Sequence, residues 1–150
     1  MAADPAATVE LAELAEAECL GLLAGKSIGR VVFTDAALPA AQPVSYLLDG
    51  TEVVFRTGGG AKLATATRGA VVAFEVDEID TATRTGWSVL GVGEAYEVLD
   101  PHRLAELARR MPAPWTGLWA PNCAAHTIAV PLRRLTGRRL VSAAPVDEPG

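Results

Sequence analysis

The sequence predicts a mainly β protein with flanking helices, folded as an antiparallel barrel of six to seven strands. Short apolar segments of strand length follow one another along most of the chain, with Gly, Pro and Asp residues between them. The predicted helices are too few to alternate with the strands, as they would in a doubly wound α/β fold. Gly91 and Gly93 interrupt a long predicted strand, as expected where a barrel wall bends.

The bulk composition is that of one globular domain. Of the 150 residues, 50% are hydrophobic and 21% are charged, so the chain carries enough apolar surface to build a core. We expect the domain to span residues 11–141, with flexible tails at residues 1–10 and 142–150. The net charge of −5 argues against a nucleic acid partner, because binding to a phosphate backbone needs a basic surface.

The N-terminal residues and the cysteines favour a cytoplasmic protein that does not contact a membrane. Residues 1–18 are acidic and lack the basic start and the apolar run of a signal peptide. No apolar segment reaches the length of a membrane span. Cys19 and Cys123 lie far apart, with no CxxC motif and no histidine cluster beside them, so we expect two reduced thiols and no metal site.

The first half of the chain contains one predicted helix and three predicted strands. Leucines recur at roughly helical spacing from Leu11 to Ala24, and Gly25 ends the helix. Asp49-Gly50 between two apolar segments is a strong signal for a β-hairpin. The predicted strands cover residues 28–33, 43–49 and 51–57, and residues 34–42 form a turn-rich connector.

The second half adds two helices and four strands. Asp100 as N-cap and Pro101 in the first turn predict the start of a helix with an apolar stripe. In the first strand of this half, Phe74 and Val76 face the core, while Glu75 alternates with them and faces solvent. The predicted elements are a short helix within residues 61–69, strands at residues 71–79 and 87–99, and a strand pair within residues 126–141.

Candidate chemistry concentrates in residues 53–63, VVFRTGGGAKL. A strand delivers Arg56 and Thr57, three glycines allow a close turn, and Lys62 starts a helix. A guanidinium, a hydroxyl and an ammonium group together suit a terminal phosphate monoester. The segment is neither a Walker loop nor a GxGxxG motif, and a glycine-rich hairpin exit with two solvent-exposed cations is the alternative interpretation.

Five segments of the chain carry a resemblance to a known family. They are ECLGLLAGKSIGRVVF, PVSYLLDGTEVVFRTGGGAKL, VVAFEVDEID, GWSVLGVGEAYEV and VPLRRLTGRRL, in this order along the sequence. Together they resemble the pyridoxamine 5′-phosphate oxidase-like family of FMN-binding split β-barrels, in its short actinobacterial-type branch. The resemblance implies an FMN-binding oxidoreductase of undefined substrate.

The resemblance also implies a homodimer with two cofactor sites at the subunit interface. Residue by residue, it assigns the FMN phosphate to Arg56, Thr57 and Lys62. It assigns the isoalloxazine ring to the strand residues Pro43, Val44 and Ser45, with Phe55 close by. The residues that it implies for the partner subunit's contribution are Trp87, Ser88 and Trp115, with Trp119 as the alternative to Trp115.

Two family motifs are missing from this sequence. RTGGGAK replaces the RxxLLK-like phosphate segment, and the C-terminal Arg-x-His pair that binds the vitamin substrate is not evident. We therefore expect a substrate other than pyridoxamine phosphate, and nothing in the sequence names a proton-transfer residue. The alternatives are a deazaflavin-dependent reductase, a flavin- or haem-binding module without turnover, and a dimeric module without a cofactor. We expect His126 to be structural rather than a haem ligand, and core or dimer packing remains the alternative role of the tryptophans.

Overall fold

The computed structural model describes residues 8–58, 62–111 and 125–143, and in these residues nine antiparallel strands form one curled sheet. The strand order across the sheet is β1-β9-β6-β5-β2-β3-β4-β8-β7. The strands are β1 Thr8–Glu13, β2 Ile28–Asp35, β3 Leu38–Asp49, β4 Glu52–Gly58, β5 Val71–Asp80, β6 Thr85–Glu94, β7 Tyr96–Glu97, β8 Ala125–Pro131 and β9 Arg134–Ala143. The helices are α1 Glu16–Ala24, α2 Lys62–Thr67 and α3 Pro101–Arg110.

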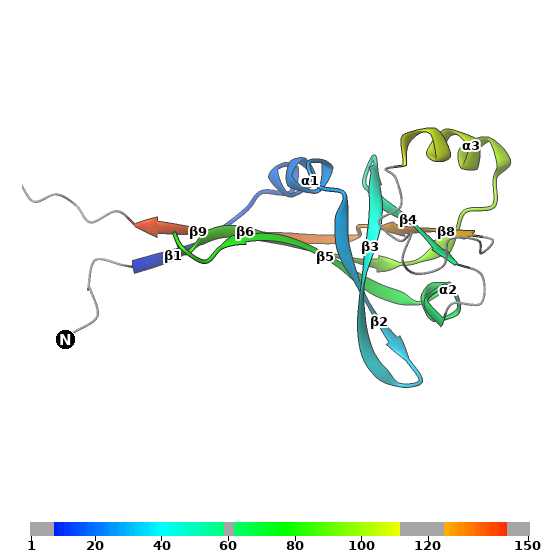
Figure 1. Cartoon of the computed structure of the whole chain (residues 1–150), viewed down its shortest axis with the longest axis horizontal. Helices are drawn as coiled ribbons and strands as arrows, with labels where there is room; N and C mark the ends of the chain where they lie inside the picture. The colour runs from blue at the N-terminus through cyan, green and yellow to red at the C-terminus, as the bar shows by residue number, and fades with distance from the viewer. Residues whose placement is uncertain (1–7, 59–61, 112–124, 144–150) are drawn as a thin grey trace, which may run out of the picture.

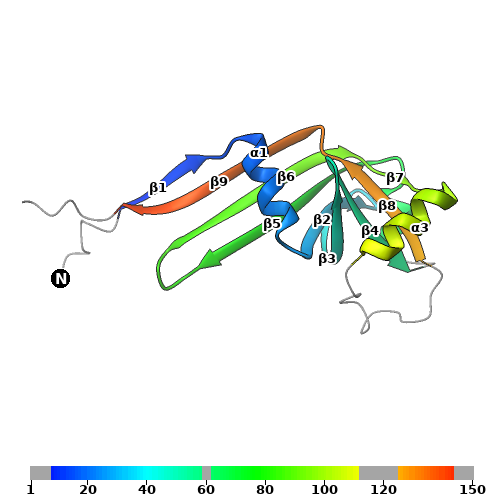
Figure 2. The ribbon, with the colours of Figure 1, turned by 90° about the horizontal axis from the view of Figure 1, so that it is seen from above.

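The sheet has an elongated part and a curled part. Strands β1, β9, β6 and β5 run side by side as an arm, and α1 crosses one face of this arm (Figures 1 and 2). Strands β4 and β8 lie at the other end of the molecule with α2 and α3. The β2–β3 hairpin projects away from the arm, on the side opposite to α1 (Figure 1).

The core lies on the side of the sheet that faces α1, which we call the inner face. Alternate residues of β5 and β6 point into it, among them Phe74 and Val89, which are 1% exposed. Cys19 of α1 and Leu63 of α2 pack into the same cluster. The buried Tyr46 hydroxyl donates a hydrogen bond to the Leu23 carbonyl, 2.5 Å away, which fixes the end of α1 to β3.

Two glycines let backbone and helix approach the inner face closely. A Cβ atom on Gly93 would lie 1.7 Å from the Pro131 carbonyl oxygen, and one on Gly137 would lie 2.5 Å from Cys19 Sγ. The Cβ atom on Gly93 would meet a backbone oxygen rather than a side chain, so no rotamer change could relieve this contact. The glycine expected to mark a bend in the wall therefore sits where β6 crosses the end of β8.

A smaller cluster joins α3 to the outer side of the curled part. Val54, Val98, Leu107 and Ala129 are its buried members. Arg103 of α3 donates a hydrogen bond to the Tyr96 hydroxyl and lies near Asp49 and Glu52, and Arg110 also pairs with Asp49. These contacts hold α3 against the Asp49-Gly50 hairpin.

The local signals for the second hairpin and for the last helix are confirmed. Gly50 has a φ of 63°, which suits a two-residue turn. Asp100 accepts a hydrogen bond from the His102 backbone N–H at 3.1 Å, and Pro101 is the first helical residue.

The predicted strand number is wrong by two or more, because the described residues contain nine strands rather than six to seven. One addition is β1, which begins inside the predicted tail of residues 1–10 and replaces the predicted start of the first helix at Leu11. Its residues pair with β9 over the whole strand, from Thr8 with Ala143 to Glu13 with Arg138. This pairing overrides the helical spacing of the leucines. The other addition is β7, which is separated from β6 by Ala95.

The predicted connector at residues 34–42 is also wrong, because β2 and β3 continue through most of it. The strands pair as far as Asp35 with Leu38, and the turn consists of Ala36 and Ala37. These two alanines have φ values of 50° and 67°, a region that favours Gly or Asn. Asp35 and Pro39 make the segment look like a connector, whereas the two turn positions themselves lack Gly and Asn, so the sequence does not predict the hairpin.

Candidate functional site

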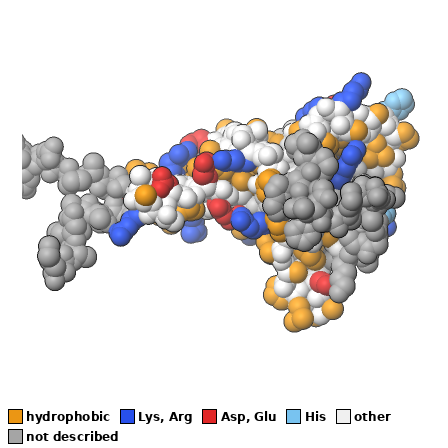
Figure 3. All heavy atoms as spheres, viewed as in Figure 1, with side chains coloured by type: hydrophobic (Ala, Val, Ile, Leu, Met, Phe, Trp, Pro, Cys, Tyr) orange, Lys and Arg blue, Asp and Glu red, His pale blue; other side chains and the backbone are white. Residues whose placement is uncertain are grey.

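The candidate site lies on the bare side of the sheet, which we call the open face. It is the face of β9, β6, β5, β2 and the adjoining part of β3 that points away from α1, and none of the described helices covers it (Figure 1). Large apolar side chains on it remain exposed to solvent, among them Val32 (36%), Ile28 (40%), Leu90 (41%) and Ile79 (50%). Apolar side chains also gather on the β2–β3 hairpin that borders this face (Figure 3). Exposed apolar side chains that lie together on one face mark a candidate interaction surface.

The strand assigned to the isoalloxazine ring contributes two residues to the open face. Pro43 pairs with Arg30 and Ser45 pairs with Ile28, and the side chains of both pairs point out of this face. Val44 lies between them, points to the core and is 2% exposed. Of these three residues, Pro43 and Ser45 therefore present their side chains to the open face.

The residues assigned to the phosphate divide between the two sides of β4. Phe55 pairs with Tyr46 and is fully buried, so the next residue, Arg56, turns to the same side as Ser45. Arg56 is exposed and makes no ion pair with any residue that the structure describes. Thr57 is 6% exposed and turns to the core side.

Lys62 is the first residue of α2, which follows β4 after residues 59–61. Its side chain lies outside the described part of the structure. The backbone thus brings Lys62 to the end of the strand that carries Arg56, as the sequence predicts.

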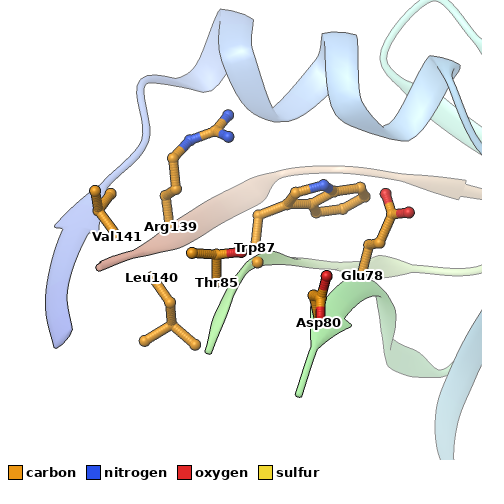
Figure 4. Close-up of a pocket in the computed structure, with 8 residues that line it drawn as sticks. Glu78, Asp80, Thr85, Trp87, Arg139, Leu140 and Val141 are labelled. Carbon is orange, nitrogen blue, oxygen red and sulfur yellow. The ribbon is translucent and has the colours of Figure 1, made fainter. Parts of the chain in front are cut away.

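The two adjacent residues assigned to the partner subunit point to opposite faces. Trp87 lies on the inner face beneath α1, is 7% exposed and is on the same side of the sheet as Arg139 (Figure 4). These two residues line a cavity of about 360 Å³ near the tip of the β5–β6 hairpin. Ser88 lies on the open face. Trp115 and Trp119 lie outside the described residues.

His126 has a defined side-chain partner. Its Nδ1 atom lies 3.0 Å from Glu97 Oε2, and Arg68 Nε lies 3.5 Å from Glu97 Oε1. The hydrogen bond to His126, aided by the charges of His126 and Arg68, lowers the pKa of Glu97. Within residues 8–58, 62–111 and 125–143, no group of three His, Cys, Asp or Glu side chains is arranged to hold a metal ion.

A charged cluster on the open face was not predicted from the sequence. Arg30 Nη1 lies 3.6 Å from Glu75 Oε1 and 3.7 Å from Asp77 Oδ2, so two carboxylates share one guanidinium. Burial, followed by the neighbouring Asp77 carboxylate, raises the pKa of Glu75 to about 7. Strand alternation indicates that Glu75 and Asp77 share a face, but only the β2–β5 pairing brings Arg30 to them.

Comparison with known proteins decides the family. The family model for pyridoxamine 5′-phosphate oxidase matches residues 15–139. The chain belongs to the pyridoxamine 5′-phosphate oxidase family. It is 42% identical over 146 residues to the uncharacterised protein Rv0080 of Mycobacterium tuberculosis, covering 93% of this chain and 92% of that one.

Solved structures of similar proteins share the fold of this oxidase-family chain. A FAD binding protein from Mycobacterium smegmatis superposes with a TM-score of 0.72 at 34% identity, over 85% of this chain and 98% of its own. A putative pyridoxamine 5′-phosphate oxidase from Corynebacterium glutamicum gives a TM-score of 0.72 at 27% identity, over 87% and 98% of the two chains. The split β-barrel predicted from the sequence is therefore confirmed.

All ten predicted site residues lie within the matched residues 15–139, whereas β1 precedes them and the last residues of β9 follow them. None of the helices in the described residues is long and apolar enough to span a membrane.

Proposed function

We propose that this oxidase-family protein is a flavin-dependent oxidoreductase that binds the flavin on its open face. The observation that carries the proposal is the shared orientation of Pro43, Ser45 and Arg56. A flat ring laid along β3 would contact the first two residues, and its phosphate would extend to the exposed guanidinium of the third. Arg56 has no carboxylate partner among the described residues, so its charge is available to an anion.

The similarity to a FAD binding protein at 34% identity supports a flavin as the ligand. We propose FMN, because Arg56 and Lys62 supply two positive charges for a terminal phosphate monoester at the end of β4. The flavin would supply hydride or single-electron transfer. The chain's own residues would bind the phosphate, support one side of the ring and exclude water from it.

We propose further that the working form is a homodimer with a flavin site at the interface. Ser45 and Ser88 share the open face, but β2 and β5 lie between their strands. Three strand spacings separate them by about 14 Å, so one chain cannot hold a ring between these two residues. A second copy docked on the open face would supply the opposite wall, including its own Ser88, and would cover the exposed apolar side chains.

A flavin titration of the purified protein tests the cofactor proposal. We expect FMN to bind with a shift in its visible absorbance and quenching of its fluorescence. Arg56→Ala and Lys62→Ala should each weaken binding more than tenfold, since a charge-assisted hydrogen bond contributes about 1.5–3 kcal/mol. FAD measured in parallel shows whether the site distinguishes the two flavins.

Arg133→Ala is the matched control, because Arg133 is also exposed but lies at the β8–β9 bend, away from β3 and β4. It should bind FMN as the parent protein does. The proposal fails if the protein binds neither flavin, or binds only a deazaflavin coenzyme. Equal affinities in the parent and in both cation variants would instead contradict the assignment of the phosphate.

A further inference from the structure

Three charged side chains on the open face do not balance one another. Glu75 and Asp77 are two residues apart on β5 and point to the same side, while Arg30 on β2 is the cation within ion-pair distance of both. The two distances, 3.6 and 3.7 Å, are longer than a hydrogen bond. One guanidinium thus lies near two carboxylates without forming a direct hydrogen bond to either of them.

Glu75 is also under-solvated for an ionised carboxylate. Its Oε1 atom is buried and accepts no hydrogen bond from any group in the described parts of the chain. The side chain borders a groove of about 350 Å³ with Ser88, Leu90 and Thr136. An ionised oxygen without donors costs free energy that a protonated carboxyl avoids.

The other charged groups near this position do not supply the missing donor. From β6, the neighbouring side chains are the uncharged Ser88 and Leu90. From β9, Arg138 lines the same groove but forms no ion pair with Glu75 within the described residues, and Glu13 of β1 is its register partner. The charged neighbours of Glu75 are therefore Arg30, Asp77 and, across the groove, Arg138.

Covering the open face makes this imbalance more costly. A second copy would remove the water that now solvates Asp77 and the exposed part of Glu75. We propose that self-association through the open face takes up a proton at the Glu75–Asp77 pair, with the proton shared between the two carboxyl groups of each chain. The inference rests on the proposed homodimer and adds its regulation: the assembly is favoured as the pH falls and weakens as the pH rises.

The raised pKa of Glu75, about 7 in the uncovered chain, puts this proton exchange in the neutral range. Association desolvates the pair further, which raises the pKa again, so the dimer binds more protons than two separate chains. By linkage, the dimer is then fully favoured below the pKa of the free chain and loses stability as the pH rises above it.

Sedimentation velocity at about pH 6, 7 and 8 tests the inference, with the dissociation constant of the dimer as the readout. Each proton taken up changes this constant about tenfold per pH unit above the pKa of the free chain, and each dimer holds two such pairs. We expect the constant of the parent protein to rise at least about tenfold between pH 6 and pH 8. Glu75→Gln, which is uncharged at every pH, should dimerise tightly at pH 8 and lose the dependence.

Glu78→Gln is the matched control, because Glu78 is on the same strand but on the inner face, paired with Lys26 at 2.9 Å. It should keep the pH dependence of the parent. Asp77→Asn provides a second test if Glu75→Gln folds poorly by circular dichroism. It removes the neighbouring carboxylate that raises the pKa of Glu75, and it should flatten the dependence.

A dimer with the same dissociation constant at all three pH values overturns the proton link and leaves the homodimer intact. That result would mean that the second copy brings a cation, such as its own Arg138, to the pair. A monomer at every pH overturns both the homodimer and the proton link. A pH dependence that persists in both Glu75→Gln and Asp77→Asn shows that another group titrates, and it also overturns the assignment.

Discussion

The two faces of β5 and β6 differ in completeness. On the inner face, Phe74, Val76 and Val89 are each at most 2% exposed and are covered within the chain itself. On the open face of the same strands, Leu90 and Ile79 are 41% and 50% exposed. The inner face thus supplies the stability of one chain, whereas the open face carries candidate ligand residues and is left uncovered by the described part of the chain. Substitutions on the two faces should therefore affect different measurements.

Phe74→Ala should give the largest effect on folding. The ring is 1% exposed and lies edge-on to Tyr46, with 4.9 Å between ring centroids. Removing it leaves a cavity and should lower the free energy of unfolding by about 3–5 kcal/mol. Urea denaturation measures this loss. A loss below about 1 kcal/mol would mean that the inner face is not the core of the single chain.

Gly93→Ala should also damage the inner face. The new methyl group would lie against the Pro131 carbonyl oxygen, so β6 and β8 would have to move apart. We expect this strain to lower the free energy of unfolding by about 1–3 kcal/mol. Gly21→Ala is the control, because nothing lies within 4 Å of a Cβ atom on this exposed helical residue. That variant should be more stable than the parent by about 0.5–1 kcal/mol. Thermal unfolding of both variants gives opposite shifts if the close approach is real.

Ile79→Arg should test the comparison from the other side. Ile79 is 50% exposed on the open face, so its replacement should change the stability of the dilute chain by no more than about 0.5 kcal/mol. The same change puts a charge into the proposed interface, and the dimer dissociation constant should rise at least about tenfold, or about 1.4 kcal/mol. Light scattering over a concentration series measures it. An unchanged constant would move the interface elsewhere.

Ala37→Gly should have the smallest effect, because it touches neither face. Ala37 has a φ of 67° in the two-residue turn of the β2–β3 hairpin, where a Cβ atom is strained. Glycine removes this strain, and we expect a gain of at most about 1 kcal/mol in the free energy of unfolding. A loss of stability in chemical denaturation would argue against the left-handed conformation at this turn.

The sequence predicted the elements that depend on local chemistry. Asp49-Gly50 and Asp100-Pro101 specify a turn and a helix start by their own geometry, and both occur where expected. By contrast, residues 8–13 and 34–42 carry no strong strand signal. Residues 8–13 form a strand because β9 pairs with them, and such pairing over a long sequence distance is not written in local composition. Residues 34–42 extend the local β2–β3 hairpin, whose turn residues Ala36 and Ala37 give no turn signal.

The resemblance assigned the candidate site to positions along the chain and not to a face of the sheet. The resemblance named consecutive residues, such as Trp87 and Ser88, while strand alternation turns one to α1 and the other to the open face. Strand alternation likewise turns Arg56 and Thr57 to opposite sides of β4. The group formed by Arg30, Glu75 and Asp77 needed the β2–β5 pairing, because its members are far apart in sequence.

The pairing of β1 with β9 also sets an order of assembly in time. Strand β9 lies between β1 and β6 in the sheet, although β1 precedes it by more than a hundred residues of chain. During synthesis, β2–β3, β3–β4 and β5–β6 can form as soon as each second strand emerges, since their contacts are local. The arm cannot be completed before β9 is synthesised. Until then β1 lacks its partner strand, and α1 lacks the strand at Gly137 against which it packs. Nascent chains would therefore hold an unpaired edge at β6 until the last strand arrives, which makes that edge the point most exposed to mispairing.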